Sequence, residues 1–215
     1  MHTKIKMFFR KNYRWILFFL CLLFFFAFAE DVFYKEIMKE DVYGYQLMKT
    51  YLIRPSLTPV VKVITWFGSA SCLVPFTLLF FLFIKNKKIG ICIGSNLFLV
   101  TILNLFAKFL FHRPRPDFQI IVENGYSFPS GHSMVSLAFY GFLLYLSCRY
   151  IKNKYLKGVL CVFLPLLILM IGVSRIYLGV HYTSDVCAGF LLSMAYLILY
   201  ISFLEKKFLK KEKIN

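Results

Sequence analysis

The chain alternates between long apolar runs and short polar segments, and this alternation predicts an all-α membrane protein. About 20 helical residues are needed to cross a hydrocarbon core of roughly 30 Å. Six runs are candidates: Tyr13–Ala29, Pro59–Ile84, Ile89–Phe111, Ser130–Cys148, Gly158–Ser174 and Thr183–Leu204. The first and fifth runs are short for a full crossing, and we expect the fifth to extend at one end. We therefore predict six transmembrane helices in a single membrane domain over residues 1–215.

The longest segment outside these runs covers residues 30–58. Its apolar residues recur at roughly helical spacing among charged residues, and its tyrosines suit a membrane interface. We expect an amphipathic helical segment on the outer surface, interrupted near Gly44. The alternative is a packed extracellular cap without lipid contact. A lid or a role in substrate entry is a further hypothesis.

Composition supports the membrane class and argues against nucleic-acid binding. The chain is 60% hydrophobic and 20% aromatic, with a mean hydropathy of +0.69, which is more apolar than a soluble domain of this length. The formal net charge is +16. However, the basic residues stand in short groups between apolar runs and form no single basic face. We expect the lipid bilayer as a partner and no nucleic acid.

The distribution of basic residues predicts the orientation in the membrane. With the N-terminus inside, 17 of the 26 Lys and Arg residues fall in the inner segments, and only Glu205 and Glu212 of the ten acids do. Both termini are then cytoplasmic, in a multi-pass plasma membrane protein. The first run also resembles a signal peptide cleaved after Ala27-Phe28-Ala29. Whether the first run is a membrane span or a cleaved signal peptide, we expect the polar stretches described next to face outward.

Cysteine usage adds no chemistry to this picture. One cysteine falls in each apolar run, with no C-x-x-C pair, so we interpret all six as small apolar residues of the helices: Cys21, Cys72, Cys92, Cys148, Cys161 and Cys187.

Three polar stretches end or begin apolar runs, where charge is costly and therefore indicates a functional site. The first contains Lys108 and Arg115-Pro116. Residues before prolines are pushed out of helical geometry, so Arg113-Pro114-Arg115-Pro116 predicts a rigid, extended exit that brings Arg115 back near Lys108. An arginine fork and a lysine point charge suit phosphate oxygens. The alternative is two interfacial cations that reach lipid head groups.

The second stretch, Pro129-Ser130-Gly131-His132, opens the fourth apolar run. Ser130 is a favourable N-cap residue, and Gly131 lets a ligand approach the backbone. The free N–H groups of a first helical turn form an anion site. A plain capped helix would not need His132 at this position, so the stretch indicates an anion site whose ligand the His132 ring would face.

The third stretch contains Arg175, His181 and Asp185. The four-residue spacing puts His181 and Asp185 on one face if the last helix begins early. Asp185 then accepts the Nδ1 proton of His181 and leaves Nε2 as a nucleophile. A metal site is the alternative, but two ligands are too few for zinc and the neighbours are cations. We expect no metal and no cofactor.

In order and spacing, the three stretches resemble the signature of the type-2 phosphatidic acid phosphatase superfamily. The pattern is Lys, six residues, Arg-Pro; then Pro-Ser-Gly-His; then Ser-Arg, five residues, His, three residues, Asp. Every position is filled between Lys108 and Asp185, and the residues are Lys108, Arg115, Pro116, Pro129, Ser130, Gly131, His132, Ser174, Arg175, His181 and Asp185. The six-helix layout extends the resemblance, and the chain looks most like compact bacterial lipid phosphatases.

The resemblance implies metal-independent hydrolysis of a membrane lipid phosphate at the extracytoplasmic face. His181 would attack phosphorus and form a phosphohistidine, His132 would protonate the departing oxygen, and Asp185 would orient His181. The residues that would hold the phosphoryl oxygens are Lys108, Arg115, Ser130, Gly131 and Arg175. Phosphatidylglycerol phosphate, undecaprenyl pyrophosphate and phosphatidic acid are all suitable substrate types.

Two other functions are compatible with the sequence. The same phosphohistidine could pass its phosphoryl group to another lipid or a sugar, because an acceptor site has no signature here. A binder or transporter of anionic lipid would need the cations but not His132, His181 and Asp185 in register. The oligomeric state leaves no signal. We interpret His112 and Arg113 as outer-loop residues, and Asp117 and Glu123 as balancing loop charge.

Overall fold

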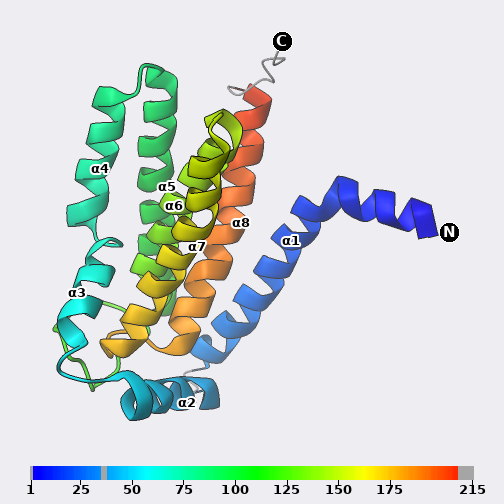
Figure 1. The fold of residues 1–215 in the computed structure, drawn as a ribbon. Coiled ribbons are helices and arrows are strands. Elements are labelled where there is room, and N and C mark those ends of the chain that lie inside the picture. The colour runs from blue at the N-terminus through cyan, green and yellow to red at the C-terminus, as the bar shows by residue number, and fades with distance from the viewer. Residues whose placement is uncertain (1, 35–37, 208–215) are drawn as a thin grey trace.

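The computed structural model describes residues 2–34 and 38–207, and all regular structure within them is helical (Figure 1). The elements are α1 (His2–Phe33), α2 (Lys39–Leu47), a π-helical turn (Met48–Leu52), α3 (Thr58–Trp66), α4 (Ala70–Phe83), α5 (Lys87–Phe111), α6 (Gly131–Tyr150), α7 (Lys154–Tyr177) and α8 (Thr183–Lys207). Asn86 and Asn153 cap α5 and α7 by accepting backbone N–H groups with their side chains. The prediction of an all-α membrane protein is confirmed.

Five of these helices are long and apolar enough to cross a membrane, and α3 with α4 supplies a sixth crossing if the pair is counted as one. The five are the Asn12–Phe33 part of α1, α5, α6, α7 and α8. The fifth predicted run extends at both ends, because the observed helix covers Lys154–Tyr177. The number of predicted spans therefore agrees with the structure, although their bounds differ.

The second predicted span is not one continuous helix. It breaks into α3 and α4 with a bend of 42°. At the break, a side chain on Gly68 would place its Cβ only 2.6 Å from Ile171 Cγ2 and 3.2 Å from His132 Cδ2. The glycine lets the chain turn close against α7 and the start of α6. The bend therefore belongs to the packing around His132.

The surface segment is helical as predicted, but the expected interruption near Gly44 is wrong. The α2 helix runs through Gly44 and continues into the π-helical turn. A Cβ on Gly44 would lie 2.1 Å from Thr183 Oγ1, so the missing side chain allows close contact with α8. Figure 1 shows α2 lying across one end of the bundle, beside the start of α8.

The core lies between α6, α7 and α8, with α5 packed on α6. Its fully buried side chains include Phe139, Phe142 and Ile171. Large apolar side chains such as Phe98, Phe109 and Leu169 face outward instead, as expected for helices in contact with lipid. The C-terminal ends of α5 and α7 and the N-terminal ends of α6 and α8 meet at the end that α2 covers. We call this the site end and the opposite one the far end.

Candidate active site

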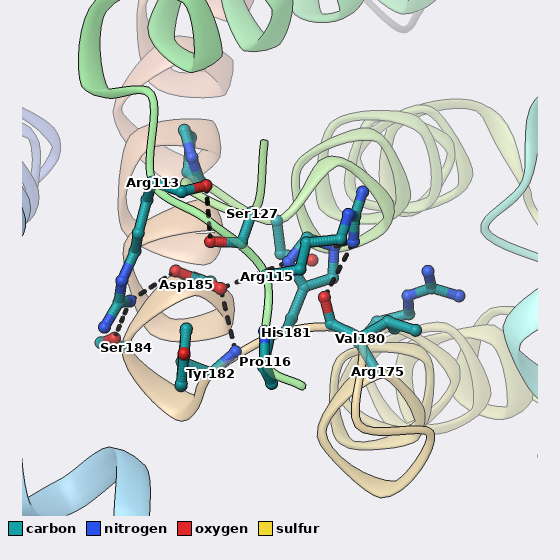
Figure 2. A network of polar contacts seen from close by, with 12 residues as sticks. Arg113, Arg115, Pro116, Ser127, Arg175, Val180, His181, Tyr182, Ser184 and Asp185 are labelled. Carbon is teal, nitrogen blue, oxygen red and sulfur yellow. Dashed lines mark hydrogen bonds and ion pairs between the residues drawn. The ribbon is translucent and has the colours of Figure 1, made fainter. Parts of the chain in front are cut away.

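The three polar stretches meet at the site end, and Figure 2 shows residues of the first and third of them side by side. Arg115 Nη1 lies 3.3 Å from His181 Nε2, which joins the first stretch to the third. The Ser130 backbone N–H donates to the Asp185 carbonyl at 3.0 Å, which joins the second to the third. Because α5, α6, α7 and α8 each contribute one end, the packing of the bundle itself sets the geometry of the site.

His181 and Asp185 form a buried pair at the start of α8. His181 lies in the turn before the helix, and its Nδ1 is 3.3 Å from Asp185 Oδ2. The Tyr182 backbone N–H also donates to that oxygen, at 2.9 Å. Burial, and then the charges of Arg175, Arg115 and Lys108, hold the pKa of His181 well below its usual range. The imidazole is therefore neutral at physiological pH, as a nucleophile requires.

The exit from α5 carries Arg115 over the end of the bundle as predicted. His112 ends the helix in the left-handed conformation, with φ of 46°. The Arg115 guanidinium then donates to the carbonyls of Val180 at 2.8 Å, Gly125 at 3.0 Å and Asn124 at 3.1 Å. Lys108 donates to the Tyr126 carbonyl and interacts electrostatically with Arg115 and Asp185.

Arg175 is 1% exposed and bridges the bend in the second span to the loop between α5 and α6. Its Nη1 donates to Thr65 Oγ1 at 2.8 Å, and its Nη2 donates to Glu123 Oε1 at 2.6 Å. Among the described residues, nothing accepts from its buried Nε. The Nε–H of the guanidinium therefore remains for an anion, whereas Glu123 already occupies an Nη2 donor.

The start of α6 has the predicted shape, although its cap differs from the prediction. Ser130 occupies the N-cap position, but its side chain makes no capping bond and its Oγ accepts from Ser133 Oγ at 3.0 Å. A Cβ on Gly131 would lie 3.0 Å from Asn104 Oδ1, so the backbone packs closely on α5. His132 follows in the first turn, close enough for electrostatic interaction with Arg175 and His181.

Three charged residues outside the predicted set belong to this site. Arg113, interpreted from sequence as a loop residue, is 7% exposed and forms ion pairs with Asp185 and Asp41, each at 2.7 Å. Glu123, interpreted as balancing loop charge, pairs with Arg175 and with Arg115. Burial alone would raise the pKa of Glu123, but the charge and hydrogen bond of Arg175 lower it. Asp41 comes from α2, and nothing in the sequence pattern singled it out.

In the part of the chain that the structure describes, no three His, Cys, Asp or Glu side chains gather as a metal site would require. The charged donors at this point are mainly cations, which suits an anion. Independence from metal stays a prediction.

A polytopic helical bundle with buried arginines, two histidines and a carboxylate at one end defines a class of membrane enzyme that handles phosphate. Residues 89–209 match the PAP2 superfamily. The chain belongs to this superfamily, and it is a membrane enzyme of the PAP2 lipid phosphatase family.

Individual relatives agree with this assignment. The chain is 33% identical over 162 residues to phosphatidylglycerophosphatase B of Bacillus subtilis, covering 72% of this chain and 79% of the relative. It is 27% identical over 194 residues to an undecaprenyl-diphosphatase of Sulfolobus acidocaldarius, covering 85% of this chain and 87% of the relative.

Two solved structures share the fold. The transmembrane PAP2-type phosphatidylglycerolphosphate phosphatase of Bacillus subtilis has a TM-score of 0.79 and 27% identity, and the match covers 90% of this chain and 98% of that one. Aquifex aeolicus LpxE has a TM-score of 0.60 at 24% identity, over 77% of this chain and 99% of that one, and this likeness concerns the fold.

Proposed function

We propose that the chain hydrolyses the phosphomonoester or pyrophosphate of a membrane lipid through a phosphohistidine on His181, without a metal ion. The observation that carries the proposal is the position of the imidazole between two charged groups. Asp185 faces Nδ1 at 3.3 Å, and Arg115 faces Nε2 at 3.3 Å. In our proposal a phosphoryl group bound by Arg115 takes the place of this contact, and the Nε2 lone pair that now faces the Arg115 guanidinium attacks phosphorus.

The first step forms the covalent intermediate. The Nε2 lone pair of His181 attacks phosphorus, and the bond from phosphorus to the lipid oxygen breaks with its electron pair. His132 gives its proton to that oxygen, so the lipid leaves as an alcohol or, from a pyrophosphate, as the monophosphate. The Nδ1 proton of His181 stays on the ring and faces Asp185 throughout, which keeps the tautomer fixed.

The second step restores the enzyme. His132, now neutral, takes a proton from water, and the oxygen of that water attacks phosphorus. The bond between phosphorus and Nε2 breaks, and its electron pair returns to His181. Inorganic phosphate leaves, so the two steps together consume one lipid phosphate and one water.

The charge that develops on the phosphoryl oxygens is stabilised by cations and backbone dipoles. Phosphoryl transfer depends mainly on such positioning and electrostatic stabilisation. In our proposal Lys108, Arg115 and Arg175 supply the positive charge, Gly131 supplies a backbone N–H at the start of α6, and Ser130 supplies its hydroxyl, which accepts from Ser133 and keeps its own proton. Glu123 competes with the phosphoryl group for the guanidinium groups of Arg115 and Arg175, because it already pairs with both.

We also propose that one domain carries the activity and that the site faces the extracytoplasmic side of the plasma membrane. The support is the charge at the far end, where lysines stand just before α5 and α7 and in the first turns of these helices: Lys85, Lys87, Lys88, Lys152, Lys154 and Lys157. Both termini are then cytoplasmic. A lipid phosphate of the kinds named for the two relatives, phosphatidylglycerol phosphate or undecaprenyl diphosphate, is the proposed substrate.

The test is release of phosphate by the purified full chain from short-chain lipid phosphates, with and without EDTA. We expect turnover to persist in EDTA and a base-stable, acid-labile phosphoprotein to be trapped by rapid quenching. His181→Ala should remove both the turnover and the trapped intermediate. Full loss of activity on chelation would overturn the metal-free step, and normal turnover by His181→Ala would overturn the role of His181.

A further inference from the structure

The Arg113 guanidinium lies between two carboxylates that come from different parts of the chain. Its Nη1 donates to Asp185 Oδ1 at 2.7 Å, and its Nη2 donates to Asp41 Oδ2 at 2.7 Å. The side chains of both aspartates are 0% exposed and that of Arg113 is 7% exposed. Burial opposes the charged form of Arg113, but the two carboxylates outweigh it and hold the pKa of Arg113 above its usual value. Arg113 therefore stays charged, and it forms ion pairs with both carboxylates in a buried cluster.

The same cluster fixes α2 to the first turn of α8. Asp41 Oδ1 accepts the Ser184 backbone N–H at 2.8 Å, and Asp41 Oδ2 accepts the Ser184 hydroxyl at 2.9 Å. Arg113 Nη1 also lies 2.7 Å from Ser184 Oγ. The close contact of Gly44 with Thr183 follows one turn further along α2. Ser184 is adjacent to Asp185, so Asp41 holds the backbone that carries the proposed orienting carboxylate.

The two oxygens of Asp185 have separate partners. Oδ1 accepts from Arg113 at 2.7 Å, whereas Oδ2 lies 3.3 Å from His181 Nδ1 and accepts the Tyr182 N–H at 2.9 Å. Arg113 is itself held over the Tyr182 ring, with 4.1 Å from Cζ to the centroid. A carboxylate held on both oxygens cannot rotate away from the imidazole (Figure 2).

The charges in the cluster give Asp41 a second effect. Arg113 alone would neutralise Asp185, and His181 would then face a pair with no net charge. Asp41 restores a net charge of −1 to the three residues together, since two carboxylates meet one guanidinium. Positive charge develops on His181 as Nε2 bonds to phosphorus, and a fixed negative cluster stabilises it. Removal of one partner would also leave an uncompensated buried charge.

We infer that Asp41 and Arg113 are positioning residues of this enzyme: α2 holds Arg113 through Asp41, and Arg113 holds Asp185 against His181. This inference rests on the proposed phosphohistidine function. Through Asp41, the α2 helix then contributes to the active site without touching the phosphoryl group. Asp41 and Arg113 act on the reaction through Asp185 and His181, so they affect the chemical step. Phosphate binding by Lys108, Arg115 and Arg175 does not depend on them.

The test compares Asp41→Asn with wild type in the purified full chain, with dioctanoyl phosphatidic acid as substrate and inorganic phosphate as inhibitor. We expect kcat to fall by about 10²-fold, the loss typical of a misplaced reacting group. KM and the inhibition constant of phosphate should stay within about threefold of wild type, because the phosphate ligands are intact. Asp117→Asn is the matched control: it removes an exposed carboxylate from the loop after α5 and should leave kcat unchanged.

Arg113→Lys is the second variant, and it keeps the test decisive if Asp41→Asn fails to fold. Lysine retains the charge but cannot contact both carboxylates with a planar fork, so kcat should fall about tenfold at an unchanged phosphate inhibition constant. A kcat within threefold of wild type in either folded variant would overturn the inference. A phosphate inhibition constant that rises in proportion to the loss of kcat would also overturn it. If His181→Ala were fully active, the proposed function would fail instead, which separates the two ideas.

Discussion

Ion pairs join helices at both ends of the bundle, but their surroundings differ. At the far end, Arg14 of α1 and Glu205 of α8 lie 2.5 Å apart, with side chains 39% and 29% exposed. Tyr145 of α6 donates to the same glutamate at 3.0 Å. At the site end, the Asp41–Arg113–Asp185 cluster has side chains 0% to 7% exposed.

This difference indicates what each set of charges is for. Removing two ions from water costs several kcal/mol per ion, so a buried pair is weak evidence for stability. An exposed pair costs little and contributes only about 0–1 kcal/mol. We infer that the far-end pair tethers α1 to α8 loosely, whereas the site-end cluster is retained for the geometry it imposes. Each prediction below changes one of the two regions.

The largest effect should follow from Asp185→Asn, which keeps the shape of the site-end cluster and removes its central charge. By analogy with the hydrolase triads, kcat should fall about 10⁴-fold, because the amide stabilises neither the correct tautomer nor the charge on His181. Steady-state phosphate release measures this loss. A fall of less than tenfold would show that Asp185 does not orient His181.

The second prediction is that activity persists to more acidic pH than an ordinary histidine would allow. Because the pKa of His181 lies well below its usual range, the neutral nucleophile should persist as the pH falls from 7.5 to 5.5. An ordinary histidine, with a pKa of about 6.5, would lose roughly tenfold of its neutral form over that interval. The charged groups that face His181 and set this behaviour are Asp185, Arg175, Arg115, Lys108 and Glu123.

This profile should be measured as kcat/KM with an aryl phosphate, whose good leaving group needs no proton from His132. The ionisation of the substrate is determined separately and divided out. A tenfold loss between pH 7.5 and 5.5 would contradict a neutral, buried His181. Asp117→Asn should follow the wild-type curve.

Features that depend on neighbouring residues could be predicted from the sequence, whereas contacts between distant segments could not. Membrane spans follow from local composition, and the signature residues follow from order and spacing. The catalytic and phosphate-binding roles of these residues stay predictions: Lys108, Arg115, His132, Arg175, His181 and Asp185. The bend at Gly68 escaped prediction because no charged residue marks it between Lys62 and Lys85. Gly44 was misinterpreted because its role depends on Thr183, which is distant in sequence.

The positioning charges were missed for the same reason. Asp41 stands among Lys39 and Glu40 at the start of a short helix, where an acid is ordinarily a solvated residue. Arg113 lies two residues from Arg115, which fits the signature. Only the packing of α2 on α8 brings Asp41 and Asp185 to the two sides of one guanidinium. The proline after Arg113 was the one local signal, since it predicts an extended backbone that carries the side chain away from α5.

A smaller effect is expected from Glu123→Gln, which removes the anion already bound to the site-end arginines. Glu123 contacts Arg175 Nη2 at 2.6 Å and Arg115 Nη2 at 3.7 Å, where we propose that the phosphoryl group binds. Without the competing charge, inhibition by inorganic phosphate should strengthen by about 3- to 10-fold, equivalent to roughly 1 kcal/mol. Glu30→Gln, an exposed acid of α1, is the control. Weaker inhibition would instead mean that Glu123 holds the arginines in place for phosphate.

The smallest effect should come from Arg14→Gln at the far end. The partly exposed pair with Glu205 contributes about 0.5 kcal/mol, so the thermal midpoint in detergent should fall by only a few degrees. Glu205 is 20 residues from Asp185 along α8, which at 1.5 Å per residue is about 30 Å, beyond the range of a screened charge. We therefore expect kcat within twofold of wild type, and Glu205→Gln should give the same result. A tenfold loss of kcat in either variant would mean that α8 transmits a change from one end to the other, and the two sets of ion pairs would then act as one system.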